Sequence, residues 1–175
     1  MCIPQLDETL FLESLTELIR LEKDWIPTEE GSSLYIRPYV FATEPAIKAN
    51  PSAAYRFAII CSPVSAYFSS AIAVKIEERF SRAAPGGFGY AKAAGNYAGQ
   101  FYPTELAKAE GYQQVVWTDA ATHSFIEEAG TMNIFVRLGD TLVTSPTSDT
   151  ILDGVTRKSM ITLCEDLGIV VEQRP

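Results

Sequence analysis

Apolar residues at helical spacing dominate the first part of the chain. Between residues 7 and 25 they recur at spacings of three, four or seven positions, at Phe11, Leu15, Leu18 and Trp25, with Leu12 and Ile19 beside them. This spacing predicts an amphipathic helix. Asp7 precedes the first apolar residue, where a short polar side chain commonly caps a helix.

Two runs rich in β-branched and aromatic residues follow, at 34–41 and 55–62, separated by a loop with proline and asparagine. We expect both runs to be strands. Tyr35 and Arg37 are two positions apart, so in a strand their side chains lie on the same face.

The remainder of the chain alternates short apolar runs with glycine-containing turns. We expect a strand over 71–83, a helix from Asn96 to Glu110 with Gly111 just beyond its end, and a helix over 155–167 closed by Gly168. Shorter strands are expected at 112–119, 123–128, 132–138, 141–146 and 169–173. This mixture predicts an α/β (α+β) fold, with a domain boundary near 63–70.

Composition narrows the range of functions. The 175 residues include 22 acidic and 14 basic side chains, for a net charge of −8, which disfavours a nucleic-acid partner. Three separated cysteines and one histidine, His123, give no metal-ligand spacing, so we expect no metal site. No apolar run approaches the roughly 20 residues that span a bilayer, so we expect no membrane partner. Without a signal peptide, the odd cysteine count favours a cytoplasmic location.

Lys92 is the first candidate for chemistry. It lies alone in GYAKAAGNYAGQ, a segment of glycine, alanine and aromatic residues. A neutral lysine is a nucleophile, and small neighbours allow a planar ring to approach the backbone. The alternative is an ordinary solvated lysine in a loop.

Two further segments are candidates. Glu127 and Glu128 end a predicted strand, so one can face solvent while the other points inward and needs a cationic partner. The alternative is a pair of surface acids. In DGVTRK, Val155 and Thr156 open a helix whose free amides form an anion cradle. The alternative there is a plain helix start capped by Asp153.

The segments YAKAAGNY, EEAGTMNIF and ILDGVTRKSM occur in this order along the chain. Together they resemble the pyridoxal-phosphate enzymes of fold type IV. LYIRP and SPVSAYF make the chain similar to one family within that group, the branched-chain amino acid aminotransferases of the larger, eukaryotic-like subgroup.

The resemblance implies a role for each matching residue. Lys92 corresponds to the catalytic lysine, which binds the aldehyde of pyridoxal 5'-phosphate and moves the proton between substrate Cα and cofactor C4′. Glu128 corresponds to the carboxylate beside the pyridine nitrogen, and Tyr97 to the tyrosine at the 3-hydroxyl. The amides of Val155 and Thr156 correspond to the phosphate contacts.

Thr131 matches a threonine near both cofactor and substrate. Tyr35, Arg37 and Tyr67 match residues that line the substrate pocket, where Arg37 helps to admit the glutamate side-chain carboxylate. The implied reaction transfers the amino group between L-leucine, L-isoleucine or L-valine and 2-oxoglutarate, giving the branched 2-oxo acid and L-glutamate.

The resemblance also implies a domain organisation and a homodimer. Residues 1–64 correspond to the C-terminal part of a small α/β domain, 65–70 to a connector and 71–175 to most of a larger pseudo-barrel domain. We therefore expect a chain truncated at both ends, which binds the cofactor weakly and shows little transamination alone.

Two alternatives remain open at this point. The first is a non-catalytic fragment of such an enzyme, acting at most as an interaction module. The second is another fold type IV enzyme, a D-amino acid aminotransferase or an aminodeoxychorismate lyase.

Overall fold

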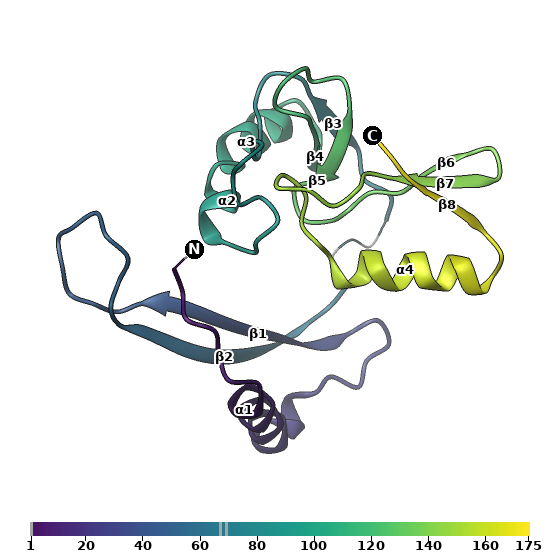
Figure 1. Cartoon of the computed structure of the whole chain (residues 1–175). Coiled ribbons are helices and arrows are strands. Elements are labelled where there is room, and N and C mark those ends of the chain that lie inside the picture. Colours follow the sequence, from purple (N-terminus) through teal and green to yellow (C-terminus); the bar gives the residue numbers. More distant parts are fainter. Residues whose placement is uncertain (1, 67, 69) are drawn as a thin grey trace. The chain divides into compact units, whose positions relative to one another are not determined.

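The computed structural model describes residues 2–66, 68 and 70–175. The chain divides into two compact units, Met1–Ser69 and Ser70–Pro175, and each is described by itself (Figure 1). The predicted connector 65–70 contains the point of division. That these units are parts of a small and a large domain stays a prediction. Among the described residues, no helix has the length and apolar character that crossing a bilayer requires.

The first unit begins with helix α1 (Glu8–Leu21). The Asp7 side chain accepts a hydrogen bond of 2.8 Å from the Leu10 amide, so the predicted cap is confirmed. The predicted end of the helix at Trp25 is wrong, because the chain tightens after Leu21 into a short 3-10 helix, Lys23–Trp25. Pro27 follows and favours the extended backbone seen at Ile26, with φ −69° and ψ 116°.

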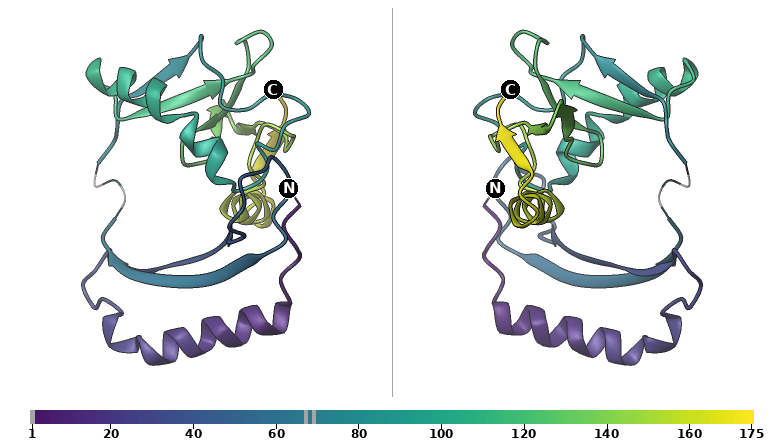
Figure 2. Two further views of the ribbon diagram at one scale, coloured as in Figure 1. Left: turned by 90° about the vertical axis from the view of Figure 1, so that its left-hand side faces the viewer. Right: turned by 90° about the vertical axis from the view of Figure 1, so that its right-hand side faces the viewer.

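A two-stranded antiparallel hairpin forms the rest of this unit. Strand β1 (Ser33–Ala42) pairs with β2 (Tyr55–Val64), with Arg37 opposite Ile60. Phe11 of α1 packs against Phe57 of β2, with 6.0 Å between ring centroids, and α1 lies alongside the hairpin in both views of Figure 2. The half-buried residues of β1, Leu34, Ile36 and Val40, lie on one face of the strand, as expected for a strand covered on that face.

The second unit contains two three-stranded sheets, each with one parallel pair bridged by helix. In the first sheet, β3 (Val74–Glu77) runs parallel to β4 (Gln114–Thr118), and β4 runs antiparallel to β5 (Ile126–Ala129). Helices α2 (Ala94–Ala98) and α3 (Phe101–Ala109) lie in the β3–β4 connection. Ala107 of α3 packs with Val115 and Trp117 of β4 in the buried core.

The second sheet has the order β6 (Val136–Leu138), β7 (Thr141–Thr144) and β8 (Val170–Gln173). Strands β6 and β7 are antiparallel, whereas β7 and β8 are parallel and are joined through α4 (Val155–Asp166). Gly168 has a φ of 69° just after α4, so the predicted closing glycine is confirmed.

Two predictions for this unit are wrong. The strand predicted over 71–83 stops at Glu77, whose side chain accepts hydrogen bonds from the amides of Arg79 and Phe80 (2.9 and 3.0 Å) and so turns the chain. The helix predicted over 96–110 is two helices divided at Gly99 and Gln100. Pro103 explains the division, because it has no amide proton for a continuous helix and fits only a first turn.

The alternative interpretation of the last helix start, a cap by Asp153, does not hold. Gly154, and not Asp153, occupies the N-cap of α4, with no side-chain cap. Asp153 instead forms an ion pair with Lys158 at 2.5 Å.

Gly89 has a packing role that the sequence did not indicate. A β-carbon there would lie 2.6 Å from Ala83 Cβ, 2.7 Å from Asp149 O and 2.8 Å from Thr150 Cα. This glycine therefore lets the segment before Lys92 lie against the backbone of residues 149–150.

We predict that Gly89→Ala lowers the free energy of unfolding by about 1–3 kcal/mol, because the crowded atoms are mostly backbone and cannot move aside. Gly99→Ala is the matched control, since its nearest atom outside its immediate neighbours lies 4.0 Å away. Thermal unfolding of both variants measures the difference. Equal melting temperatures for the two would contradict this packing role.

Candidate functional site

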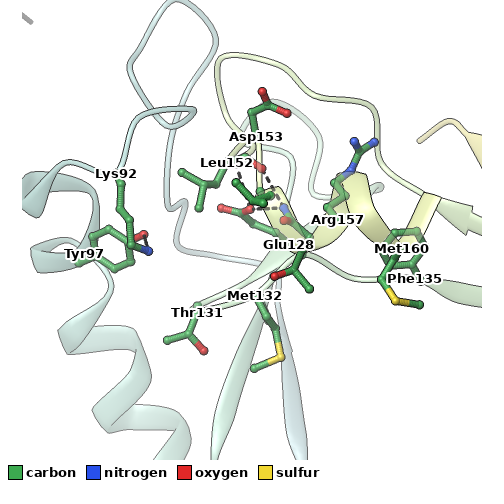
Figure 3. Close-up of a pocket in the computed structure, with 16 residues that line it drawn as sticks. Lys92, Tyr97, Glu128, Thr131, Met132, Phe135, Leu152, Asp153, Arg157 and Met160 are labelled. Atoms are coloured by element: carbon green, nitrogen blue, oxygen red, sulfur yellow. Dashed lines mark hydrogen bonds between the residues drawn. The ribbon is translucent and has the colours of Figure 1, made fainter. Parts of the chain in front are cut away.

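A cavity of about 610 Å³ lies in the second unit, between the Lys92 segment, the end of β5 and the start of α4. Figure 3 shows Lys92 and Tyr97 on one side of the cavity, across from Leu152, Glu128, Asp153 and Arg157. The lining residues come from four short stretches of sequence: Lys92 and Tyr97; Glu128 to Asn133; Phe135; and Leu152 to Arg157 with Met160.

Lys92 and Tyr97 form a local pair. Ala93 is the N-cap residue of α2, so Lys92 lies one position before the cap and Tyr97 lies within the helix. The lysine Nζ lies 3.2 Å from the tyrosine Oη and 5.2 Å from the ring centroid, so it donates a hydrogen bond and also contacts the aromatic face. Lys92 is exposed, and its side chain lines the cavity.

Glu128 is the buried acid of the site, with 4 % of its surface exposed. Its Oε1 lies 2.7 Å from Nη2 of Arg82. Its Oε2 accepts hydrogen bonds from Asn133 Nδ2 at 3.0 Å and from the Leu152 amide at 3.1 Å. Both oxygens are therefore held in place by donors from three different segments.

The environment of the two adjacent acids shifts their pKa values. Burial raises the pKa of Glu128, while the positive charge of Arg82 and the Leu152 amide act in the opposite direction. Burial likewise raises the pKa of Glu127, against a hydrogen bond of 2.5 Å from the Thr150 hydroxyl and the charge of Arg82. Glu127 is half-buried, so only Glu128 points fully inward, as one of the two acids was expected to do.

Arg82 is the functional residue that sequence reasoning missed. Its guanidinium is buried, pairs with Glu128, and donates hydrogen bonds to the carbonyl oxygens of Gly89 (2.9 Å) and Thr150. A buried glutamate needs a cationic partner, so the sequence did indicate that a basic residue would lie beside it. The sequence alone did not show which arginine folds against Glu128, because the pairing is long-range.

The start of α4 supplies free amides. Its first backbone hydrogen bond runs from Lys158 N to Gly154 O (3.1 Å), so the amides of Val155 and Thr156 precede the helical bonding pattern. Gly154 has no side chain that could accept hydrogen bonds from these amides, and Val155 and Thr156 both line the cavity. A helix start of this kind favours an anion.

Thr131 lies in the turn after β5 and lines the cavity. Its Oγ1 accepts a weak hydrogen bond of 3.4 Å from Gln114 Nε2. Gly130 allows this contact, because a β-carbon there would lie 2.5 Å from Gln114 Oε1.

The structure thus brings six of the predicted site residues to one cavity: Lys92, Tyr97, Glu128, Thr131, Val155 and Thr156. Tyr35 and Arg37 belong to the first unit, where Arg37 Nη2 donates to Tyr35 Oη at 3.1 Å and the guanidinium stacks 5.2 Å from the ring centroid. They share a face, as predicted, and their role toward the cavity stays a prediction. Tyr67 lies outside the described residues.

Comparison with known proteins identifies the family of this fold. A family model described as "Amino-transferase class IV" matches residues 2–175. "Branched-chain-amino-acid transaminase 1" of Bacillus subtilis is 46% identical over 177 residues, which are 99% of this chain and 50% of that protein. The "Branched-chain-amino-acid aminotransferase" of Mycobacterium tuberculosis is 43% identical over 182 residues, again 99% and 50%. The chain spans about half the length of these curated relatives.

Solved structures of branched-chain aminotransferases have a similar fold. The branched-chain aminotransferase of Thermoproteus uzoniensis, solved with norvaline, superposes with a TM-score of 0.82 at 26% identity, over 95% of this chain and 54% of that one. The Escherichia coli branched-chain amino acid aminotransferase gives 0.79 at 28% identity, over 98% and 55%. The predicted mixed α/β fold and fold type IV resemblance are confirmed. The match over nearly every residue shows that this chain belongs to the class IV aminotransferase family.

Proposed function

We propose that this chain is the cofactor-binding part of a pyridoxal 5'-phosphate-dependent branched-chain amino acid aminotransferase. The observation that carries the proposal is the three-sided cavity, which combines an amine, a buried carboxylate and a free helix N-terminus. The names of the relatives, all branched-chain aminotransferases among those cited, support the substrate class.

The donor set fits pyridoxal 5'-phosphate group by group. A primary amine, Lys92, suits an aldehyde, and the amides of Val155 and Thr156 suit a phosphate. The Glu128 carboxylate suits a ring nitrogen that carries a proton, and Tyr97 suits a ring hydroxyl. A further branched-chain amino acid aminotransferase of the same fold, 25% identical with a TM-score of 0.80, was solved with pyridoxamine 5'-phosphate. When bound, the cofactor supplies an electron sink for the charge left on the substrate carbon.

Lys92 and Glu128 perform the proton chemistry in this proposal. Lys92 Nζ would hold the cofactor through its aldehyde group, and the same amine would move the proton at the substrate Cα. Glu128 holds the proton at the ring nitrogen. Burial raises the pKa of Glu128 and so disfavours its charged form, whereas Arg82 stabilises the charged carboxylate that this role requires.

The remaining residues bind and orient. Tyr97 positions Lys92 through the 3.2 Å contact and would also bind the ring hydroxyl. Thr131 lies beside both cofactor and substrate in this proposal. We further propose, from the family resemblance alone, that Tyr35, Arg37 and Tyr67 contribute to substrate recognition, and that the guanidinium of Arg37 binds the second carboxylate of 2-oxoglutarate and L-glutamate. We also propose that the complete enzyme is a homodimer.

We predict that Lys92 is the preferred site of covalent modification when the chain is incubated with pyridoxal 5'-phosphate and reduced with borohydride. Peptide mapping by mass spectrometry compares Lys92 with Lys108, an exposed lysine that pairs with Glu105 at 2.7 Å. We expect roughly tenfold more label on Lys92, because the phosphate and ring contacts hold the aldehyde beside it. Lys92→Arg keeps the charge and should remove this label.

Equal labelling of the two lysines would contradict the proposed cofactor site. That outcome would favour the alternative of a non-catalytic fragment.

We predict that Arg82→Met lowers the free energy of unfolding by about 3–5 kcal/mol at neutral pH, since it leaves the buried Glu128 carboxylate unpaired. Without Arg82, the folded-state pKa of Glu128 rises further above its unfolded value. The folded protein then binds an extra proton, so stability is lost as the pH rises through this window. Denaturant unfolding across a pH series measures the effect, which should shrink at acidic pH.

Arg82→Met combined with Glu128→Gln is the matched control. It removes both charges and should recover part of the stability at neutral pH. A pH-independent loss that the second substitution does not relieve would contradict a charge-based role for Arg82.

A further inference from the structure

We propose that Asn133 is a positioning residue that fixes the Glu128 carboxylate to the start of α4. Nothing in the comparisons assigns it a role. The inference rests on the proposed function in one respect: the two features that Asn133 connects are the proposed contacts for the cofactor ring nitrogen and for its phosphate.

The side-chain amide of Asn133 donates both of its protons to the site. One hydrogen bond goes to Glu128 Oε2 at 3.0 Å, and the other goes to the carbonyl oxygen of Leu152 at 2.9 Å. Leu152 N donates in turn to the same Oε2 at 3.1 Å. Three hydrogen bonds thus form a closed ring through the acid, the amide and the backbone that leads into α4.

The ring continues directly into the helix start. The Leu152 carbonyl that accepts from Asn133 also accepts from Gly154 N, at 2.8 Å. On its other side Asn133 Oδ1 lies so close to Gly154 that a β-carbon on the glycine would overlap it. Gly154 is the N-cap of α4, and Val155 and Thr156 follow it. The position of Asn133 therefore sets where these two amides begin.

The backbone holds Asn133 in this position. It forms an isolated antiparallel bridge with Glu128, and Ala129 N donates to Met132 O at 2.9 Å to close the turn between them. That turn also presents Thr131. A rotation of the Asn133 side chain would break its hydrogen bonds to Glu128 and Leu152 at once.

Asparagine suits this position because it is uncharged and offers two protons on one nitrogen. Aspartate has nearly the same shape but offers no proton and would place a second negative charge beside Glu128. The charged groups that already act on Glu128 are Arg82, Glu127 and Lys92.

A double-mutant cycle in the absence of any ligand tests the inference. Gly154→Ala should lower the melting temperature in the native background, because the new methyl group displaces Asn133. The backbone angles of Gly154, φ −68° and ψ 133°, are compatible with alanine. In the Asn133→Ala background the obstructing atoms are absent, so Gly154→Ala should have little further effect. Gly99→Ala serves as the control in both backgrounds.

Additive effects of the two substitutions would overturn the inference. Asn133→Asp supplies an independent check, since it preserves the shape and loses the donor. It should destabilise the chain at neutral pH, and a native-like melting temperature for this variant would also count against the inference.

Ligand affinity provides the readout that a general loss of stability would not change. Dissociation constants are measured below the melting temperature of each variant for pyridoxal 5'-phosphate and for pyridoxal, which lacks the phosphate. The factor by which the phosphate tightens binding reports how well the α4 amides hold it. We expect Asn133→Ala to reduce this factor roughly tenfold. An unchanged factor would overturn the link to phosphate binding.

These measurements separate the two proposals. If the native chain binds neither compound, the proposed function fails, whereas the unfolding cycle still decides whether Asn133 joins Glu128 to α4.

Discussion

The buried ion pair between Arg82 and Glu128 is the constraint on which the candidate site depends. Burying either charge alone would be costly, and the pair persists because each partner also has further hydrogen bonds. Arg82 contacts the Gly89 and Thr150 carbonyls, whereas Glu128 contacts Asn133 and Leu152. One salt bridge thus joins the segment before Lys92, the end of β5 and the approach to α4.

Glycines let these segments approach closely enough for that pair to form. The small residues around Lys92 were expected to admit a flat ring, yet Gly89 lies against the backbone of residues 149–150. Gly130 and Gly154 similarly face Gln114 and Asn133. Within this second unit, Gly89 thus brings two backbone segments together, whereas Gly130 and Gly154 make room for side chains that lie against the backbone.

The parts of the fold that depend on local sequence could be predicted. The Asp7 cap and the closing residue Gly168 follow from hydrogen bonds and backbone angles set by near neighbours, and the two hairpin strands were predicted from their local residue types. The errors arose where one residue breaks a periodic pattern. Glu77 ends a strand by binding the next amides, and Pro103 divides a helix.

The site was predictable to the extent that its motifs are continuous in sequence. Lys92 with Tyr97, and Val155 with Thr156, each lie within a few positions of one another. The pairing of Arg82 with Glu128 and the link from Asn133 to Leu152 join distant segments. Periodicity carries no information about such long-range contacts, so one sequence cannot reveal them.

The charges around Glu128 have a consequence for the net charge of −8. Around the Glu128 carboxylate lie one further acidic side chain, Glu127, and two basic ones, Arg82 and Lys92. The formal charges of these four side chains sum to zero, in contrast to those of the whole chain. Near these four side chains the formal charges cancel, so the dipole of α4 would orient an anionic ligand in the cavity.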